Sequence, residues 1–299
     1  MKTIIIAGGS GFLGQVLEKY LSGKGYDIKI LTRHPKKSNH IFWDAKTLGK
    51  WANQLNNTEA LINLTGKSVD CRYTDKNRKL IYDSRIDSTH VIGLAINLCE
   101  HPPKVWLNSS TATIYRGSKT TEMTEAKGEI GNDFSMNIAK SWEYEFNSIT
   151  NPKTRKVLLR TSIVLGKNGG AMKPLKKLTK VFLGGKQGSG DQKLSWIHEQ
   201  DFARSVEFLI NQPELEGAFN VCAPKPTDNK TFMSVLRKSL KIPFGLPQPK
   251  WLIEIGALLI GTESELVLKS RNVIPERLLK HNFNFKFQNI NSALQNLSI

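Results

Sequence analysis

The stretch that decides the fold lies close to the N-terminus and reads Thr3-Ile-Ile-Ile-Ala7-Gly8-Gly9-Ser10-Gly11-Phe12-Leu13-Gly14. A run of apolar, β-branched residues turns directly into a glycine-rich loop, and an amphipathic segment follows over residues 12–21. Strand, loop and helix in this order form the context that a dinucleotide-binding fingerprint requires. Gly9, Gly11 and Gly14 fit the pattern G-x-G-x-x-G, so we expect a dinucleotide to bind where the strand meets the helix.

The glycines and the helix start have separate physical roles. The early glycines permit a tight turn and a close approach of the backbone to a pyrophosphate, and Gly14 lets the helix pack on the strand. The free N–H groups and the dipole of the helix N-terminus face the anion. The alternative is a loop whose glycines mark only a turn. We predict that the cofactor contacts the whole loop, which comprises Gly8, Gly9, Ser10, Gly11, Phe12, Leu13 and Gly14.

The end of the second expected strand indicates which dinucleotide is bound. About 20 residues beyond the glycines, an NAD enzyme usually carries an Asp or Glu for the ribose 2′-hydroxyl. Here the chain reads Thr32-Arg33-His34-Pro35-Lys36-Lys37, which is cationic and contains no acid. A guanidinium pairs with a 2′-phosphate and stacks on adenine, so Thr32 and Arg33 favour NADP(H) as the cofactor. The alternative is a solvated basic loop.

The composition is that of a globular protein. Its 299 residues can bury a large core, and 39% of them are hydrophobic. The chain has no run of about 18 apolar residues, and the apolar run at its start is too short for a signal peptide. Cys71, Cys99 and Cys222 lack a metal-ligand spacing and cannot all pair, which is typical of a reducing compartment. We expect a cytoplasmic protein with no metal site and no membrane partner.

The formal net charge of +17 raises the question of an anionic partner. Lysines and arginines are dispersed over the expected helices and loops, without a recognition-helix motif or a basic block interleaved with aromatic residues. Such dispersed lysines usually belong to solvated faces. We expect nonspecific adhesion to nucleic acid at low salt, but no specific nucleic-acid partner.

Strands and helices alternate along the chain, which is typical of an α/β protein with a doubly wound parallel sheet. The expected strands comprise residues 4–7, 28–32, 41–43, 60–64, 105–109, 157–160 and 219–222. The expected helices include residues 74–99, 133–148 and 200–211. We predict a Rossmann-type NADP-binding domain from residues 1–165 and about 200–222. Residues 166–199 and 223–299 are predicted to form a smaller α/β substrate lobe.

Several motifs spread over nearly the whole chain point to one family. They comprise residues 8–14, Asn63-Leu-Thr-Gly66, Asp83-Ser-Arg85, residues 109–115, residues 160–166, Trp196-Ile-His198 and Asn220-Val-Cys-Ala-Pro224. In these motifs the chain resembles an extended, atypical short-chain dehydrogenase/reductase. More narrowly, it resembles the uncharacterised NAD-dependent epimerase/dehydratase-like family with a C-terminal domain of unknown function. The resemblance implies a Rossmann domain with a smaller C-terminal substrate lobe, and helix-paired homodimers are common in the superfamily.

The fourth expected strand ends at the edge of the sheet where open α/β folds bind their ligands. Small residues after this strand allow the backbone to approach the cofactor's ribose. We therefore expect contacts from Leu64, Thr65 and Gly66, and the alternative is a strand-ending turn.

The resemblance implies roles for two later strand ends. Ser109 lies in the segment expected beside the cofactor, and Thr111 matches the hydroxyl that hydrogen-bonds the reacting oxygen. Arg160 and Thr161 resemble the segment that passes beside the nicotinamide. For Arg160, an ion pair at the protein surface is the alternative.

The catalytic pattern departs from the superfamily. Its members usually carry Tyr-x-x-x-Lys on a helix, where the cation lowers the pKa of the phenol for proton transfer. Lys140 fits the lysine, but Met136 occupies the tyrosine position, and a thioether cannot transfer a proton. Tyr115 or Tyr144 could substitute, although a half-buried packing role is favoured for both.

A second departure concerns the substrate. Nucleotide-sugar epimerases carry an arginine just before the aromatic-x-His block, and Leu194 occupies that position here. A nucleotide-sugar epimerase is therefore the third hypothesis. For His198 a structural role is favoured over that of a general base.

The sequence thus predicts an NADP(H)-dependent oxidoreductase or epimerase-like enzyme for a small carbonyl or hydroxyl compound. Thr111 would polarise the oxygen and Lys140 would orient the ribose, while the proton donor is unassigned. The alternative is a non-catalytic NADP(H)-binding redox sensor, which tolerates the loss of an acid at Met136.

Overall fold

A seven-stranded parallel sheet forms the centre of the protein, of which the computed structural model describes residues 1–298. Its strands are β1 (Thr3–Ala7), β2 (Asp27–Thr32), β3 (His40–Phe42), β4 (Ala60–Asn63), β5 (Val105–Thr111), β6 (Arg155–Thr161) and β10 (Gly217–Val221). They lie in the order β10-β6-β5-β4-β1-β2-β3. The chain order reverses between β1 and β4, and ligands of such sheets bind at the strand ends beside this switch point.

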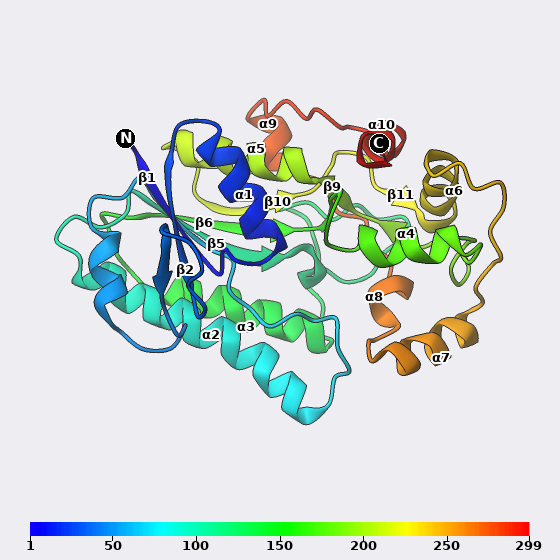
Figure 1. The fold of residues 1–299 in the computed structure, drawn as a ribbon, viewed down its shortest axis with the longest axis horizontal. Coiled ribbons are helices and arrows are strands. Elements are labelled where there is room, and N and C mark those ends of the chain that lie inside the picture. Colours follow the sequence, from blue (N-terminus) through cyan, green and yellow to red (C-terminus); the bar gives the residue numbers. More distant parts are fainter. Residues whose placement is uncertain (299) are drawn as a thin grey trace.

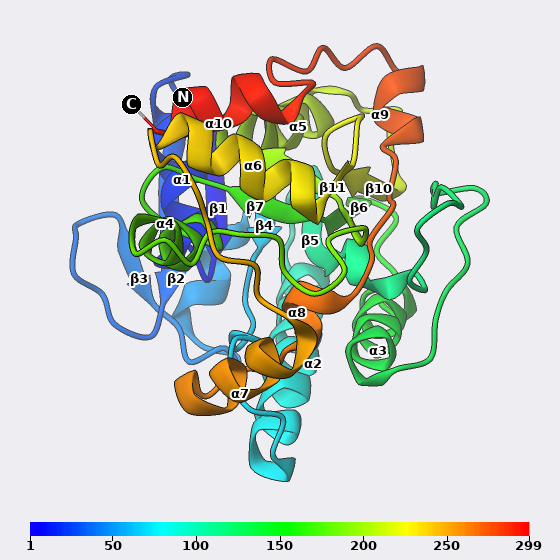
Figure 2. The ribbon, with the colours of Figure 1, turned by 90° about the vertical axis from the view of Figure 1, so that its right-hand side faces the viewer.

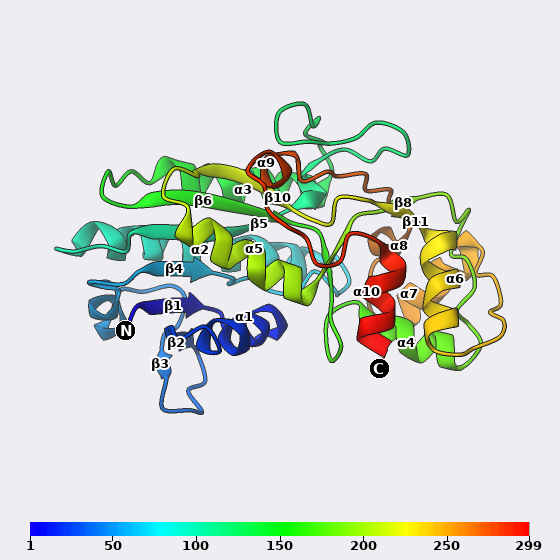
Figure 3. The same ribbon diagram turned by 90° about the horizontal axis from the view of Figure 1, so that it is seen from above.

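Two layers of helices cover the sheet, as Figure 1 and Figure 3 show. One layer contains α1 (Phe12–Ser22) and α5 (Glu199–Asn211), and the other contains α2 (Asp75–Leu98) and α3 (Phe134–Ser148). Short 3-10 helices lie at Lys50–Leu55 and Ala112–Ile114.

The residues of β1 explain why both faces are covered. Side chains alternate along a strand, so Ile4 and Ile6 enter the core that contains α5, while Ile5 enters the core that contains α2. All three isoleucines are fully buried. A strand that is apolar on both faces is typical of a parallel sheet between helices.

The prediction of a doubly wound Rossmann-type sheet is confirmed. Each predicted strand is present, and the observed ends differ from the predicted ones by at most two residues. The strand β5 runs on to Thr111 because it pairs with β6 as far as Thr161.

The remaining elements form a smaller lobe beyond the carboxyl ends of the strands (Figure 1), and Figure 2 shows the molecule with this lobe toward the viewer. Its strands pair as β7 (Ile163–Leu165) with β9 (Trp196–His198), and as β8 (Lys193–Leu194) with β11 (Thr227–Asp228). Its helices are α4 (Met172–Lys180), α6 (Asn229–Ser239), α7 (Lys250–Ile260), α8 (Glu265–Leu268) and α10 (Ile290–Ser298). This lobe has a core of its own, which includes Trp196, Phe232 and Leu294.

The division of the chain into residues 1–165 with 200–222 and residues 166–199 with 223–299 stays a prediction. The helix α9 (Glu276–Lys280) and the segment after it pack on the large sheet's side of the molecule. Leu278, Phe283 and Phe285 belong to the core that contains α1 and α5. These apolar side chains cover part of α5, so this segment packs on the large sheet's side although it follows the smaller lobe in the chain.

A helix that crosses a membrane must be long and predominantly apolar. Within residues 1–298, no helix is both long enough and apolar enough to cross a membrane.

Candidate cofactor and active site

The glycine loop between β1 and α1 is shaped by close backbone contacts. Gly8 has a φ of +74°, and a Cβ there would lie 3.0 Å from the backbone nitrogen of Thr65. A Cβ on Gly14 would lie 2.2 Å from the carbonyl oxygen of Gly9. Gly11 differs, because a Cβ there would meet nothing closer than 3.7 Å. Gly8 and Gly14 are therefore needed for the fold, whereas Gly11 leaves space for a ligand.

The start of α1 is open to an anion. Gly11 precedes the helix and has no side chain to cap it. The first N–H groups of a helix have no partner within the helix, and the helix dipole adds positive potential there. These groups can hold a pyrophosphate, as the sequence predicts.

A cavity of about 610 Å³ extends from this loop along the ends of β2 and β4. It is lined by eight of the predicted cofactor residues: Gly8, Ser10, Gly11, Thr32, Arg33, Leu64, Thr65 and Gly66. The buried hydroxyl oxygen of Thr65 has no hydrogen-bond partner among residues 1–298. A buried polar atom without a partner is costly unless a ligand satisfies it. The glycine cradle and this hydroxyl fit a bound dinucleotide.

A neighbouring cavity of about 670 Å³ lies on the other side of the loop. It is lined by Gly9, Ser10 and Thr32, together with lysines and histidines that follow β2. The hydroxyl groups of Thr32 and Ser10 lie 3.4 Å apart and join the loop to the end of β2.

A third cavity, of about 890 Å³, lies at the opposite edge of the sheet. Its lining includes Lys2, Lys104 and Arg155, which lie at or just before the starts of strands. Ligands of open α/β sheets bind at the carboxyl ends of the strands. The cavity beside the glycine loop is therefore the candidate cofactor site.

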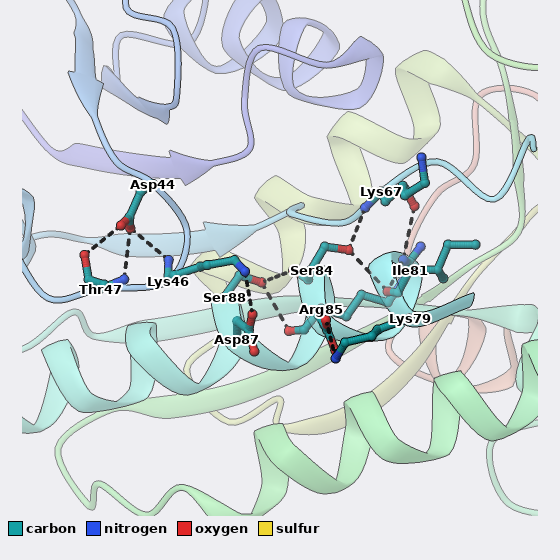
Figure 4. Close-up of polar contacts among 11 residues, drawn as sticks. Asp44, Lys46, Thr47, Lys67, Lys79, Ile81, Ser84, Arg85, Asp87 and Ser88 are labelled. Carbon is teal, nitrogen blue, oxygen red and sulfur yellow. Dashed lines mark hydrogen bonds and ion pairs between the residues drawn. The ribbon is translucent and has the colours of Figure 1, made fainter. Parts of the chain in front are cut away.

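Sequence reasoning missed Asp44 and Lys46, which also line the cavity beside Arg33. The Asp44 carboxylate accepts hydrogen bonds from the backbone of Lys46 and from Thr47, and Lys46 Nζ lies 3.4 Å from Asp87 Oδ2 (Figure 4). Burial opposes the charge on Asp44, but the hydrogen bonds outweigh burial and lower its pKa. Both residues follow β3, which ends at the same edge of the sheet as β2. Their position directly after a predicted strand could therefore have indicated them from the sequence.

Two of the predicted loop residues direct their side chains away from the cavity. The ring of Phe12 fills the space beside Gly166 and Gly169, where a Cβ would lie 2.3 Å from ring carbons. Leu13 packs against the core that contains α1. The expected contacts of Phe12 and Leu13 with a cofactor are therefore backbone contacts.

Buried polar side chains fix the ends of β4 and β5. Asn63 Nδ2 donates to Asn108 Oδ1 at 2.7 Å, and its neighbour Thr89 accepts from Trp142 Nε1 at 2.9 Å. Asn108 Nδ2 in turn donates to the carbonyl oxygen of Ser109. This network joins both strand ends to α2 and α3.

Thr111 lies at the last position of β5, with its hydroxyl able to donate. Its Oγ1 accepts a hydrogen bond from the backbone of Thr113 at 3.1 Å, which leaves the hydroxyl proton for another acceptor. The structure thus leaves Thr111 competent for its predicted role, and that role stays a prediction.

The helix α3 carries Lys140 and Met136. Lys140 Nζ donates to Asn132 Oδ1 at 2.7 Å just outside the start of the helix. Met136 is buried, and its sulfur occupies the space that a side chain on Gly131 would need. The position of the usual tyrosine is therefore filled by an apolar packing residue.

Neither substitute tyrosine is placed for catalysis. Tyr115 is fully buried, and its hydroxyl bonds Asn220 Oδ1 at 3.0 Å and Arg160 Nη1 at 2.7 Å. Burial raises the pKa of Tyr115. Tyr144 is 76% exposed on the outer face of α3.

The side chain of Arg160 is engaged by partners within the protein, so its predicted contact with the cofactor stays a prediction for the backbone alone. Its Nε and Nη2 donate to the two carboxylate oxygens of Glu143, and its Nη1 donates to Tyr115. The pair is inside the protein, not at its surface, because the neighbouring strands and α3 enclose it. The guanidinium is occupied by internal partners, so Arg160 holds β6 to α3. The predicted cofactor contacts of Ser109 and Thr161 stay predictions.

His198 has the structural role that the sequence favours. Its Nδ1 accepts from the backbone of Gln200 at the start of α5, and its Nε2 lies 3.1 Å from Asn296 Oδ1. The ring also stacks on Phe287. Both nitrogens are used within the protein.

Comparisons with known proteins agree with this geometry. Residues 4–222 match the model of the NAD dependent epimerase/dehydratase family, and residues 248–297 match a domain of unknown function, DUF1731. The "Epimerase family protein SERP0438" of Staphylococcus epidermidis is 32% identical over 302 residues, with 99% of each chain covered. The "Epimerase family protein SAR0825" of Staphylococcus aureus is 31% identical over 304 residues, again with 99% of each chain covered.

Two solved structures extend the comparison. The human epimerase family protein SDR39U1 (isoform2), solved with NADPH, superposes with a TM-score of 0.91 at 27% identity over 99% of both chains. The UDP-N-acetylglucosamine 4-epimerase of Bacillus cereus has a TM-score of 0.79 at 18% identity over 100% of this chain and 98% of its own, which shows the fold alone. The chain belongs to the NAD-dependent epimerase/dehydratase family, whose members use NAD(P), and its residues 248–297 match DUF1731.

Proposed function

We propose that this protein is an NADP(H)-dependent oxidoreductase that acts on a small carbonyl or hydroxyl compound. One observation carries the proposal: Arg33, and no acid, follows β2 where this strand reaches the cavity of the glycine loop. An acid at this position would select NAD, and a guanidinium selects the 2′-phosphate. The human family member solved with NADPH supports the same cofactor.

The charges around this cavity favour a phosphate. Arg33 is exposed at its mouth, and Lys46 lines it from the segment after β3. Asp44 is the nearest acid in the same segment, but three hydrogen bonds from Lys46 and Thr47 occupy its oxygens. Asp83 lines the cavity as well, and its carboxylate pairs with Lys79. Arg33 therefore offers the 2′-phosphate a charged donor, while both acids of the lining have partners within the protein.

The chemistry follows from Thr111 and Lys140. Bound NADPH would supply a hydride. The Thr111 hydroxyl then donates a hydrogen bond to the carbonyl oxygen that gains negative charge, and Lys140 holds the ribose. The final proton on that oxygen comes from a group that is unassigned, because Met136 has none to give.

The test of the cofactor is a pair of calorimetric titrations of Arg33→Asp. The variant should lose NADPH affinity at least tenfold more than NADH affinity, because a repelling charge replaces the phosphate partner. Lys24→Asp, in the exposed turn after α1, carries the same charge change and should leave both affinities unaltered. Equal loss for both cofactors would remove the 2′-phosphate assignment.

The test of the activity is a screen of carbonyl compounds against the NADPH-loaded protein. At least one member should accelerate NADPH oxidation above the background rate. A screen in which no carbonyl compound does so contradicts an oxidoreductase.

A non-catalytic NADP(H) sensor is the second candidate, and the packing of Met136 against Gly131 favours it. A sensor needs cofactor binding without a proton donor. Affinity capture from a lysate, with and without NADPH, tests this candidate. Recovery of the same partners in both samples would count against a sensor.

A further inference from the structure

Arg85 on α2 lies directly under the loop that follows β4. Its Cζ is 3.1 Å from the position that a Cβ on Gly66 would occupy, and it lies 5.0 Å from the centre of the Trp142 ring. The guanidinium is therefore enclosed between a loop that lines the cofactor cavity and the helix that carries Lys140.

The hydrogen bonds of Arg85 use one edge of its guanidinium. Nη1 donates to the carbonyl oxygens of Lys67 at 3.1 Å and Ile81 at 2.9 Å (Figure 4). Within residues 1–298, neither Nε nor Nη2 has a hydrogen-bond partner, and no carboxylate forms an ion pair with Arg85. The Nε–Nη2 edge is the one that binds a carboxylate or phosphate through two parallel hydrogen bonds.

Two other arginines of the chain form the kind of ion pair that Arg85 lacks. Arg160 pairs with Glu143, and Arg204 pairs with Asp201 at 2.7 Å. Burial lowers the pKa of Arg85 to about 10, so the group remains a cation at neutral pH. Neither Nε nor Nη2 is a fully buried atom, so this edge is accessible to an anionic ligand that would supply the missing counter-charge.

The anion is not a phosphate of the cofactor. We assign the pyrophosphate to the start of α1 and the 2′-phosphate to Arg33. Arg85 lies one helical turn before Thr89, which contacts the polar network at the ends of β4 and β5. Through Asn63 and Asn108 this network reaches β5, whose last residue is Thr111. Trp142, beside Arg85, lies on α3 together with Lys140.

We propose that Arg85 binds a carboxylate or phosphate group of the substrate through its Nε–Nη2 edge, so that the substrate is an acidic carbonyl compound. That the substrate carries a carbonyl group rests on the proposed function. It makes Arg85 the residue that selects acidic substrates over neutral ones.

Calorimetry on the NADP⁺-loaded protein tests the proposal without the need for turnover. Oxalate and inorganic phosphate serve as anionic probes, and oxamide serves as a neutral analogue of oxalate. The wild type should bind at least one anion and not oxamide. Binding of oxalate alone indicates a carboxylate substrate, and binding of phosphate alone indicates a phosphorylated one.

Three variants make the result specific. Arg85→Gln should weaken anion binding at least tenfold. Arg85→Lys keeps the charge but cannot donate two parallel hydrogen bonds, so it should weaken anion binding less. NADP⁺ affinity should stay within twofold in both, which also shows that the site is folded. Arg72→Gln, at an exposed arginine paired with Glu263, is the matched control and should bind anions like the wild type.

Several outcomes overturn the proposal. They are the absence of anion binding in the wild type, equal binding of oxamide, and unaltered anion binding in Arg85→Gln. A loss of NADP⁺ affinity in both Arg85 variants would instead assign Arg85 to the cofactor. Anion binding through Arg85 in a protein that oxidises no NADPH would refute the oxidoreductase and leave the anion site standing.

Discussion

Arg160 and Glu143 form a bidentate ion pair inside the protein, with Nε 2.8 Å from Oε1 and Nη2 2.7 Å from Oε2. The pair joins β6 to α3, and Arg160 continues through Tyr115 to Asn220 on β10. Ser110 on β5 also donates to Glu143. Burial opposes the charge on Arg160, but the bonds and charge of Glu143 outweigh burial and raise its pKa. Polar contacts therefore hold the carboxyl ends of β5, β6 and β10 to one helix.

Removal of one partner from this pair should destabilise the fold. Glu143→Ala leaves an enclosed guanidinium without its counter-charge, which costs about 3–5 kcal/mol in free energy of unfolding. Urea denaturation of wild type and variant measures the loss. The double variant Glu143→Leu with Arg160→Met should recover much of the stability, because it leaves no unpaired charge. The double variant should bind NADPH with the affinity of the wild type. A large loss of affinity would show that the Arg160 side chain is a cofactor ligand.

Two glycines of the loop should respond differently to alanine. Gly14→Ala places a Cβ against the Gly9 carbonyl oxygen, so it should cost about 3 kcal/mol of stability and abolish cofactor binding. Gly11→Ala meets no close atom in the protein and should change stability by about 0.5 kcal/mol or less. Its methyl group faces the pyrophosphate position, so NADPH affinity should fall at least tenfold. Thermal unfolding and calorimetry separate the two effects, and unaltered affinity in Gly11→Ala would place the pyrophosphate elsewhere.

The hydroxyl of Thr111 should matter for turnover and not for cofactor binding. Thr111→Val removes a donor to the reacting oxygen, and loss of such a donor lowers kcat by about 10²–10³. Thr111→Ser keeps the hydroxyl and should retain activity within about tenfold, since the donor remains. The measurement is NADPH oxidation with a carbonyl compound from the screen. Similar rates for Val and Ser at this position would mean that another group polarises the oxygen.

His198 should make stability depend on pH. Burial lowers its pKa to about 4 in the folded protein, whereas the unfolded chain has a pKa of about 6.5. The unfolded state then binds more protons below pH 6.5, so this contribution to stability is complete above that pH and is lost as pH falls toward 4. Between pH 7.5 and pH 5 the loss should be on the order of 2 kcal/mol.

The control for this effect is His198→Asn, which keeps an acceptor at the start of α5. Urea unfolding of both proteins at pH 7.5 and pH 5 isolates the contribution of the imidazole. The wild type should lose more stability than the variant on acidification. An equal loss in the two proteins would mean that His198 does not titrate in this range.

The sequence predicts the sheet and the cavity at the ends of its strands well, for a physical reason. The apolar run of β1, the glycines and the helix after them are local signals, since neighbouring residues alone decide turn geometry and burial pattern. The connectivity of parallel strands then brings the ends of β2 and β4 to the same edge. Eight predicted residues therefore line one cavity.

Side-chain partners could not be predicted in the same way. Arg160 is taken by Glu143, 17 residues away, and Tyr115 bonds Asn220, 105 residues away. No local pattern encodes such pairs, because they depend on how α3 and β10 pack against the sheet.

The sequence by itself determined the Rossmann-type sheet, the glycine loop at its carboxyl edge and the cationic residue that follows β2. Only the tertiary structure decided that Met136 packs on Gly131, that Arg160 is satisfied internally and that Arg85 is not. The reason is that backbone conformation follows from short stretches of chain. The partner of an enclosed charge depends on which distant residues the finished fold brings within hydrogen-bond distance.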